Sequence, residues 1–154
     1  FGPAAAEIGH LRPGLDAVDE HATVESIASG LALERAAATL ADDPALARYG
    51  DKLNAETLAR AAKGGHAPSR AVLDRAFAAL GWAIAQTITL LAPQVVVVGG
   101  GVAKMRDVSF YDELRAAVDR YAFPPLRGSY EIRPPQLGEA MVVHGTLAMA
   151  KAER

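Results

Sequence analysis

Residues 94–101 read QVVVVGGG, four valines in a row followed directly by three glycines. Valine is branched at Cβ and favours extended backbone, so residues 94–98 are predicted to form a β-strand. The run is continuously apolar instead of alternating, which is typical of a parallel strand buried on both faces. The glycines follow its carboxyl end, where open α/β sheets bind ligands. This stretch predicts an α/β fold with a candidate ligand site at the glycine turn.

Helical patterns lie on both sides of this strand. Apolar side chains recur every three or four residues over 70–91, which predicts a long helix with one stripe facing a core. Beyond the glycines we expect a helix over 110–121, a strand over 130–133 and a last helix over 138–152. This order predicts a helix-rich chain with two parallel strands joined by a helical crossover.

The first half of the chain is also expected to be largely helical. Thr23 is a candidate N-cap for an apolar-periodic stretch over 24–40. Ser29 and Gly30 interrupt that stretch, which predicts one short turn followed by a second helix. A further short helix is expected over 54–62.

Composition excludes several classes of protein. The chain has 154 residues, the size of one domain, with 51% hydrophobic and 22% charged residues, which excludes a disordered chain. The net charge of −2 argues against a basic nucleic-acid-binding domain. No apolar run reaches the length of a membrane span, so no membrane partner is expected. The absence of cysteine excludes disulfides and cysteine-ligated zinc and fits a cytoplasmic location.

The turn Gly99-Gly100-Gly101 could let a ligand approach the backbone, because glycine has no side chain and adopts positive φ. It lacks the spaced glycine of a dinucleotide fingerprint, and no Gly-Lys-Ser/Thr follows it as in a phosphate-binding loop. On spacing alone, a nucleotide site and a plain strand-to-helix turn both fit these residues.

Glu7 and His10 form a second candidate cluster, and Glu25 is a third candidate. Carboxylates and imidazoles exchange hydrogen bonds with ligand hydroxyls. The alternative for Glu7 and His10 is a pair of exposed loop residues. For Glu25 it is a favourable interaction with the dipole of a helix N-terminus.

The remaining histidines point to no chemistry of their own. Asp16, Asp19, Glu20 and His21 offer donors that cations accept, but they have no recognisable ligand spacing, so a solvated loop is predicted. His66 is expected in a turn where a helix stops. No Ser-His-Asp arrangement stands out.

Several segments together resemble the ROK family, which comprises sugar kinases and sugar-responsive repressors. The stretches EIGH at 7–10 and TVESIASG at 23–30 are similar to its sugar-site segment, G-E-I-G-H followed by C-L-E-x-x-A-S-G. Residues 80–103 resemble its L-G-x-x-I-A-x-x-x-x-L-x-x-P-x-x-I-x-x-G-G-G-V-A signature. The ending, LGEA at 137–140 and then Gly-Thr at 145–146, looks like its closing helix.

The resemblance implies an actin-like (ribonuclease H-like) ATPase fold, of which this chain is most of the C-terminal lobe. It implies that Glu7, His10 and Glu25 bind the sugar substrate. Carboxylates suit that role because they accept hydrogen bonds from sugar hydroxyls in fixed directions.

The same resemblance implies the nucleotide side of the site. Gly99, Gly100 and Gly101 would approach the adenosine part of ATP, whose phosphates would be held by Mg²⁺ and other loops. Ser29 and Gly30 are further candidates on the nucleotide side.

Two departures from the family pattern matter. Many members bind a structural zinc through the histidine matching His10 and three cysteines, but residues 14–22 contain no cysteine. We therefore expect no zinc and no other metal site. The family's phosphate loops and catalytic aspartate belong to an N-terminal lobe or its end, and none is present in this chain, which begins at Phe1 without a methionine.

We accordingly interpret residues 1–154 as one domain, the C-terminal lobe of a longer protein whose N-terminal lobe is its partner. Phosphoryl transfer depends on positioning and charge neutralisation between two lobes. No catalytic residue is therefore assigned, and this chain alone is not expected to phosphorylate sugars.

Three functions stay open from the sequence. The first is part of a cytoplasmic ATP-dependent hexose kinase, a glucokinase-like transferase of carbohydrate metabolism. The second is the sugar-sensing part of a repressor, for which alone nucleic acid would be a partner. The third is a self-standing α/β ligand-binding module. A homodimer is implied by analogy with the family.

Overall fold

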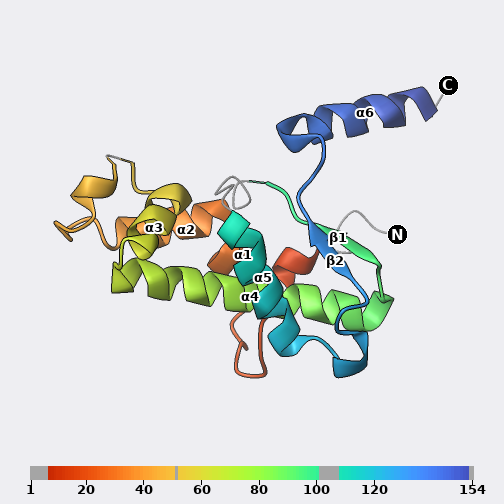
Figure 1. Ribbon diagram of the computed structural model, residues 1–154, viewed down its shortest axis with the longest axis horizontal. Helices are drawn as coiled ribbons and strands as arrows, with labels where there is room; N and C mark the ends of the chain where they lie inside the picture. Colours follow the sequence, from red (N-terminus) through yellow and green to blue (C-terminus); the bar gives the residue numbers. More distant parts are fainter. Residues whose placement is uncertain (1–6, 51, 101–107, 153–154) are drawn as a thin grey trace.

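The computed structural model describes residues 7–50, 52–100 and 108–152. Figure 1 shows helices gathered around one long helix, a small sheet beside its carboxyl end, and a last helix that stands clear of the rest. In chain order the helices and strands are α1 (Val24–Ala28), α2 (Gly30–Ala38), α3 (Ala55–Lys63), α4 (Ala67–Leu91), β1 (Val95–Val97), α5 (Val108–Tyr121), β2 (Glu131–Arg133) and α6 (Met141–Ala152). Short 3₁₀ turns are η1 (Ile8–His10), η2 (Ala47–Tyr49), η4 (Pro124–Leu126) and η5 (Gly138–Ala140).

The break predicted at Ser29 is confirmed. Thr23 opens α1 with a capping box, in which its side chain accepts from the Ser26 amide and the Ser26 hydroxyl accepts from the Thr23 amide. Ser29 then ends α1 and caps α2, because its hydroxyl accepts from the Ala32 amide at 3.1 Å. Two short helices therefore replace one long one.

The long helix predicted over 70–91 is α4, and it packs against α1, α3 and α5. It begins after His66, whose ring accepts a hydrogen bond from the Ser69 amide. It ends at Ala92, which adopts left-handed backbone with φ 44°, just before Pro93. His66 lies in the turn that ends α3, as expected, because its amide donates to the Ala61 carbonyl at 2.9 Å, and the same residue also caps the start of α4.

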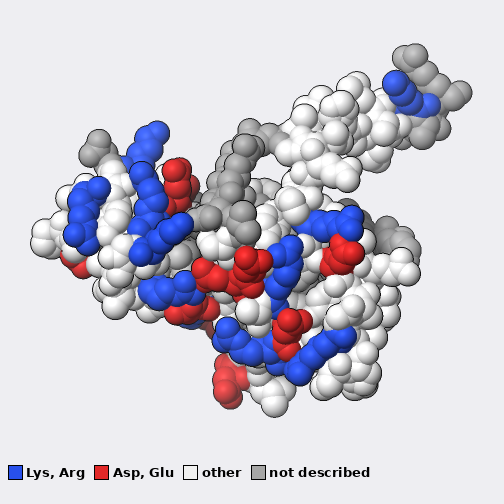
Figure 2. Space-filling view, in the orientation of Figure 1, with Lys and Arg blue, Asp and Glu red and all other residues white. Residues whose placement is uncertain are grey.

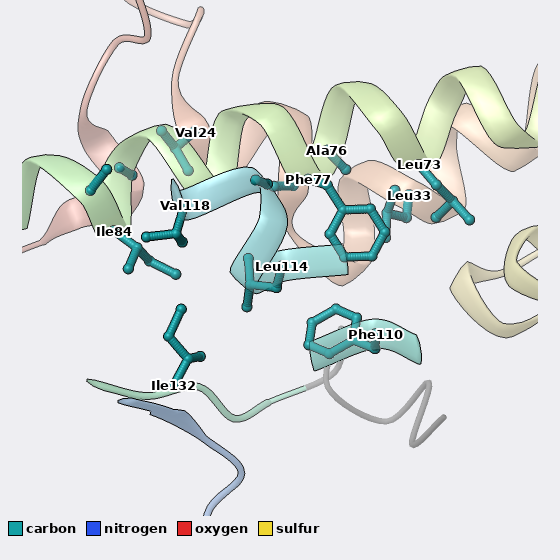
Figure 3. Close-up of a cluster of buried hydrophobic side chains, with 14 of the residues drawn as sticks. Val24, Leu33, Leu73, Ala76, Phe77, Ile84, Phe110, Leu114, Val118 and Ile132 are labelled. Atoms are coloured by element: carbon teal, nitrogen blue, oxygen red, sulfur yellow. The ribbon is translucent and has the colours of Figure 1, made fainter. Parts of the chain in front are cut away.

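Buried side chains from both halves of the chain form one core (Figure 3). Phe77 of α4 packs against Phe110 of α5 with 5.4 Å between ring centroids. Ile132 of β2 reaches the same cluster from the sheet side, next to Leu114 and Val118. The core therefore ties the sheet to α4 through α5.

The helices α4 and α5 approach most closely at Gly81. A Cβ added there would lie 2.7 Å from both the carbonyl carbon and the Cβ of Ala117. The missing side chain of Gly81 is what allows the two backbones to pack.

Gly81→Ala is therefore expected to lower the free energy of unfolding by about 1–3 kcal/mol, because the helices must separate. Urea denaturation would measure the loss. The matched control is Gly145→Ala in α6, where nothing lies within 4 Å of an added Cβ. That change should be neutral or slightly stabilising, since alanine favours helix. Equal losses for the two variants would contradict the close crossing.

The two strands form a parallel sheet, as predicted. β1 pairs with β2 in the register Val95 to Glu131, Val96 to Ile132 and Val97 to Arg133, and α5 lies in the connection between them. The Val98 amide extends the pairing by donating to the Arg133 carbonyl at 3.0 Å.

The prediction that β1 is buried on both faces is wrong for the part of the chain described. Val96 packs against the core, but Val95 and Val97 are 45% and 58% exposed. The reason is that α5 and the core cover only one face of the two-stranded sheet. None of the helices in the described ranges is long and apolar enough to cross a membrane.

Candidate functional site

The structure brings the first candidate cluster together with Glu25. The turn η1 packs against α1, and the Val24 amide donates to the Leu11 carbonyl at 2.8 Å. A Cβ on Gly9 would lie only 3.4 Å from the Cβ of Glu25. Glu7 and His10 lie at the two ends of the turn that contains Gly9, and both are exposed, as is Glu25.

Local structure sets where these side chains lie. Because the Thr23 capping box begins α1, Glu25 falls in the first helical turn, close to the backbone amides at the helix start. His10 ends η1, and its chain neighbour Leu11 is tied to α1 through its carbonyl. The site surface is therefore held by backbone hydrogen bonds, and its side chains remain free to meet a ligand.

The α1–α2 junction is the next part of the surface. The Ser29 amide donates to the Glu25 carbonyl at 3.1 Å, while the Ser29 hydroxyl is occupied as the cap of α2. Gly30 has open space where a side chain would stand. Ser29 thus acts structurally here, and Gly30 leaves room beside it.

The described part of the glycine turn is open. Gly100 has φ of +90°, which disfavours any residue with a side chain, and nothing lies within 4 Å of an added Cβ. Gly99 is half-buried beside it, and Gly101 lies outside the described residues. The Tyr111 hydroxyl donates to the Val98 carbonyl at 2.9 Å and so holds the end of the strand. Burial raises the pKa of Tyr111, which keeps that hydroxyl protonated.

Helix α1 and the start of α5 meet in space. Ala28 of α1 and Phe110 of α5 line the same small cavity, together with Leu33 and Phe77. Residue 110 follows the glycine turn closely in the chain. Helices α1, α2, α4 and α5 therefore enclose one shared apolar cavity.

A larger cleft, which the sequence patterns did not single out, lies between α3, α4 and α5 on the other side of Phe110. Its volume is about 410 Å³. Phe77 and Phe110 supply an apolar wall. The charged lining consists of three basic residues, Arg60, Lys63 and Arg70, and two acidic ones, Glu56 and Glu113. The basic residues in the last turn of α3 and the start of α4 were the available signal, but only packing shows that they share one cavity.

Ion pairs order the Arg70 side of the cleft. Arg70 contacts Asp74 one helical turn along and Glu113 of α5 at 2.5 Å. Arg70 donates hydrogen bonds to both carboxylates, which raises the pKa of Arg70, and these bonds in turn lower the pKa of Asp74. Arg70 is thus held charged at the cleft wall.

The structure also reveals a Ser-His-Asp chain that the sequence did not suggest. His66 Nε2 lies 2.8 Å from Asp43 Oδ2, and His66 Nδ1 lies 2.7 Å from Ser69 Oγ. The Ser69 amide also points to Nδ1, and an amide can only donate, so Nδ1 is an acceptor and the ring proton lies on Nε2. Ser69 is fully buried and out of reach of a substrate. The arrangement therefore acts as a helix cap tied to Asp43.

This tie predicts a pH dependence. The hydrogen bond from His66, followed by that from the Ala45 amide, holds the pKa of Asp43 below its usual 3.8. A depressed folded-state pKa stabilises the protein above the unfolded pKa, and that contribution disappears as pH falls through the folded value. The stability difference between wild type and Asp43→Asn should thus be full near pH 6 and shrink below about pH 4. Urea denaturation between pH 6 and 2.5 would measure it, with Asp42→Asn as control. A pH-independent difference would contradict the tie.

The described residues thus form an α/β unit in which a parallel strand leads into a glycine turn. Its candidate ligand sites are the exposed carboxylates near α1 and the cleft between α3, α4 and α5. The ROK family model matches residues 1–153. The chain belongs to the ROK family.

Similar proteins agree with this membership. A glucokinase from Thermotoga maritima is 31% identical over 106 residues, which cover 69% of this chain and 33% of that protein. A ROK family glucokinase from Streptomyces griseus, solved in complex with glucose and AMPPNP, matches with a TM-score of 0.69 and 25% identity, covering 88% of this chain and 48% of that one. A ROK family transcriptional regulator, a homologue of the Escherichia coli MLC protein, shares the fold with a TM-score of 0.63 and 21% identity, covering 82% of this chain and 33% of that one.

The fold is thus the actin-like ATPase fold of ROK sugar kinases, helix-rich with a small parallel sheet. The chain spans between a third and a half of the length of these relatives.

Proposed function

We propose that this chain is the C-terminal lobe of a ROK-type, ATP-dependent hexose kinase and supplies sugar-binding and adenosine-binding residues. One observation carries the proposal. The chain matches the ROK model over 1–153, and the turn that holds Glu7 and His10 packs against α1, the helix that carries Glu25. The Streptomyces griseus glucokinase, whose structure holds glucose and AMPPNP, makes a hexose and ATP the ligands to test.

On the sugar side, Glu25 and Glu7 would accept hydrogen bonds from sugar hydroxyls, and His10 would donate or accept one. Hydrogen bonds to a carboxylate are stronger than those between neutral groups and are directional. The chain contains no cysteine, so the thiolates of a zinc site are missing and His10 is available to the sugar. We accordingly propose that the loop holds no zinc.

On the nucleotide side, Gly99, Gly100 and Gly101 would let adenosine approach the backbone. Phe110, nine residues after Gly101 in the chain, lines the cleft between α3, α4 and α5. The aromatic wall of this cleft suits a purine ring, and its three basic residues outnumber its two glutamates, which favours the negative charge of a nucleotide. Mg²⁺ bound to the phosphates would supply further charge neutralisation.

We propose that the catalytic base and the phosphate loops lie on the N-terminal lobe and not in this chain. Ligand binding and phosphoryl transfer can then be tested separately on this chain. Isothermal titration of the chain with glucose, and separately with ATP, should show weak binding, since each ligand meets only one of its two walls. Single-turnover assays of the same sample should form no sugar phosphate. Absence of glucose binding would refute the sugar site, and formation of sugar phosphate would refute the division of labour.

The second candidate is the sugar-sensing part of a ROK repressor. This candidate is supported by the ROK transcriptional regulator, which shares the fold of this chain. The residues that precede Phe1 in the full-length protein discriminate the two functions: a glycine-rich phosphate loop supports the kinase, and a DNA-binding helix-turn-helix supports the repressor.

A further inference from the structure

The carbonyl of Val98 is the last acceptor of the β1 backbone before the glycine turn, and β2 cannot satisfy it. In the parallel sheet the Glu131 amide donates to the Gln94 carbonyl at 2.9 Å, and the Val98 amide donates to the Arg133 carbonyl at 3.0 Å. Because the two strands of a parallel ladder donate in turn, the next donor would be the amide of residue 135. That residue is Pro135, and proline has no N–H. The Val98 carbonyl therefore needs a donor from outside the sheet.

Tyr111 of α5 supplies this donor. Its hydroxyl donates to the Val98 carbonyl at 2.9 Å, across 13 positions of the chain. The Tyr111 ring lies edge-on against Phe110, with 5.0 Å between ring centroids, and Phe110 is itself buried in the core. The hydrogen bond thus joins the end of the strand to the start of a helix that the core holds in place. The residue that precedes the glycines is thereby tied to the core.

The glycines that follow have little of their own to fix the backbone. Gly100 adopts φ of +90°, and no described atom lies within 4 Å of an added Cβ there. Glycine also has more backbone freedom than any other residue. The position of Gly99 and Gly100 therefore depends on how firmly the chain is held at Val98.

The charges on this side of the molecule do not replace that control. Figure 2 shows Lys and Arg side chains interspersed with Asp and Glu over α4 and α5. Interspersed charges of both signs produce no large field of one sign that would draw a nucleotide to one place. A nucleotide at the glycine turn therefore depends on close approach to a correctly placed backbone.

We propose that Tyr111 is a positioning residue for nucleotide binding: its hydroxyl takes the place of the amide that Pro135 lacks and holds the glycine turn where adenosine can approach it. This role rests on the proposed nucleotide function of the turn. Tyr111 acts through the Val98 carbonyl and not through contact with the ligand.

Tyr111→Phe tests this role, because it removes the hydroxyl and keeps the ring against Phe110. Isothermal titration of the chain with ATP should give a dissociation constant about three- to tenfold larger than that of wild type, since one neutral hydrogen bond is lost. The dissociation constant for glucose should stay within twofold. In the longer kinase that carries this lobe, KM for ATP should rise by a similar factor, while kcat and KM for hexose stay near their wild-type values.

Tyr130→Phe is the matched control, because it also removes a hydroxyl that donates a hydrogen bond, here to Asp119 at 2.7 Å. Tyr130 precedes β2, so it lies at the end of the strand pair away from the glycine turn. Its replacement should leave the dissociation constant for ATP within twofold. Circular dichroism and urea denaturation would establish that both variants are folded at the temperature of the titration.

Hydrogen exchange gives a second readout that needs no ligand. The Val98 amide is bonded to the Arg133 carbonyl, so it is expected to exchange slowly while the end of the strand is held. Its exchange should quicken at least threefold in Tyr111→Phe and stay unchanged in Tyr130→Phe.

Three results would overturn the positioning role: an unchanged ATP affinity in Tyr111→Phe, equal losses of ATP affinity in the two variants, or an equal loss of glucose affinity. A wild-type chain that binds no ATP would instead refute the proposed nucleotide site. The hold of Tyr111 on the turn is then judged by hydrogen exchange alone, and an unaccelerated Val98 amide would refute it.

Discussion

Phe110→Ala is expected to lower the free energy of unfolding by about 3–5 kcal/mol, the usual cost of emptying a phenylalanine site in a core. Phe110 is buried and packs against Phe77 at 5.4 Å and edge-on against Tyr111 at 5.0 Å between ring centroids. It fastens the start of α5 to α4, so its loss also loosens the connection to the sheet. Urea denaturation followed by circular dichroism would measure the change.

Phe123→Ala is the matched control, because Phe123 is 51% exposed. Its replacement should cost less than about 1 kcal/mol, since little burial is lost. A loss at Phe110 no larger than that at Phe123 would contradict the core described here. Phe110 also lines the α3–α4–α5 cleft, so ATP affinity should fall in Phe110→Ala even at temperatures where the variant stays folded.

Glu25→Gln is expected to weaken glucose binding and, in the longer kinase that carries this lobe, to lower kcat/KM for hexose by about 10- to 100-fold. The change keeps the shape of the side chain but removes the charge. Hydrogen bonds to a charged group are worth about 1.5–3 kcal/mol, which corresponds to that range. Titration with glucose and steady-state kinetics would measure the two effects.

Glu34→Gln is the control for this change. Glu34 is equally exposed and lies on α2, one of the two short helices of the same region, but outside the proposed site. It should leave glucose binding and kcat/KM unchanged. Unaltered kinetics in Glu25→Gln, or equal losses in the two variants, would remove Glu25 from the site.

The parallel pair and its crossover helix were predictable from local pattern. The valine run, the glycines after it and the second short strand each carry a signal within a few residues, and the structure confirms their pairing. The helix break at Ser29 was predictable for the same reason, because capping depends on residues three apart. The exposure of Val95 and Val97 was not, since it depends on which layers surround the sheet.

The site was predictable only in part. Resemblance to a family singled out Glu7, His10 and Glu25, and the structure packs the turn that holds the first two against the helix that carries the third. Their roles in binding stay predictions. The cleft between α3, α4 and α5 was missed because its wall combines residues from 56 to 113, which no short motif spans.

The sequence by itself determined the elements of this protein, its ROK membership and the candidate ligand groups, because helix periodicity, capping and motif spacing are local properties. Only the tertiary structure decided which residues, distant in the chain, come into contact. It joined Asp43 to His66 across 23 positions, brought Gly9 against Glu25, and placed Gly81 where only a glycine fits beside Ala117. Among residues 7–50, 52–100 and 108–152 it also left one face of the valine strand uncovered. The physical reason is that burial, close packing and shared cavities arise between segments that are distant in the chain. Which of their side chains touch is set by the packing of the whole core and not by a short sequence pattern.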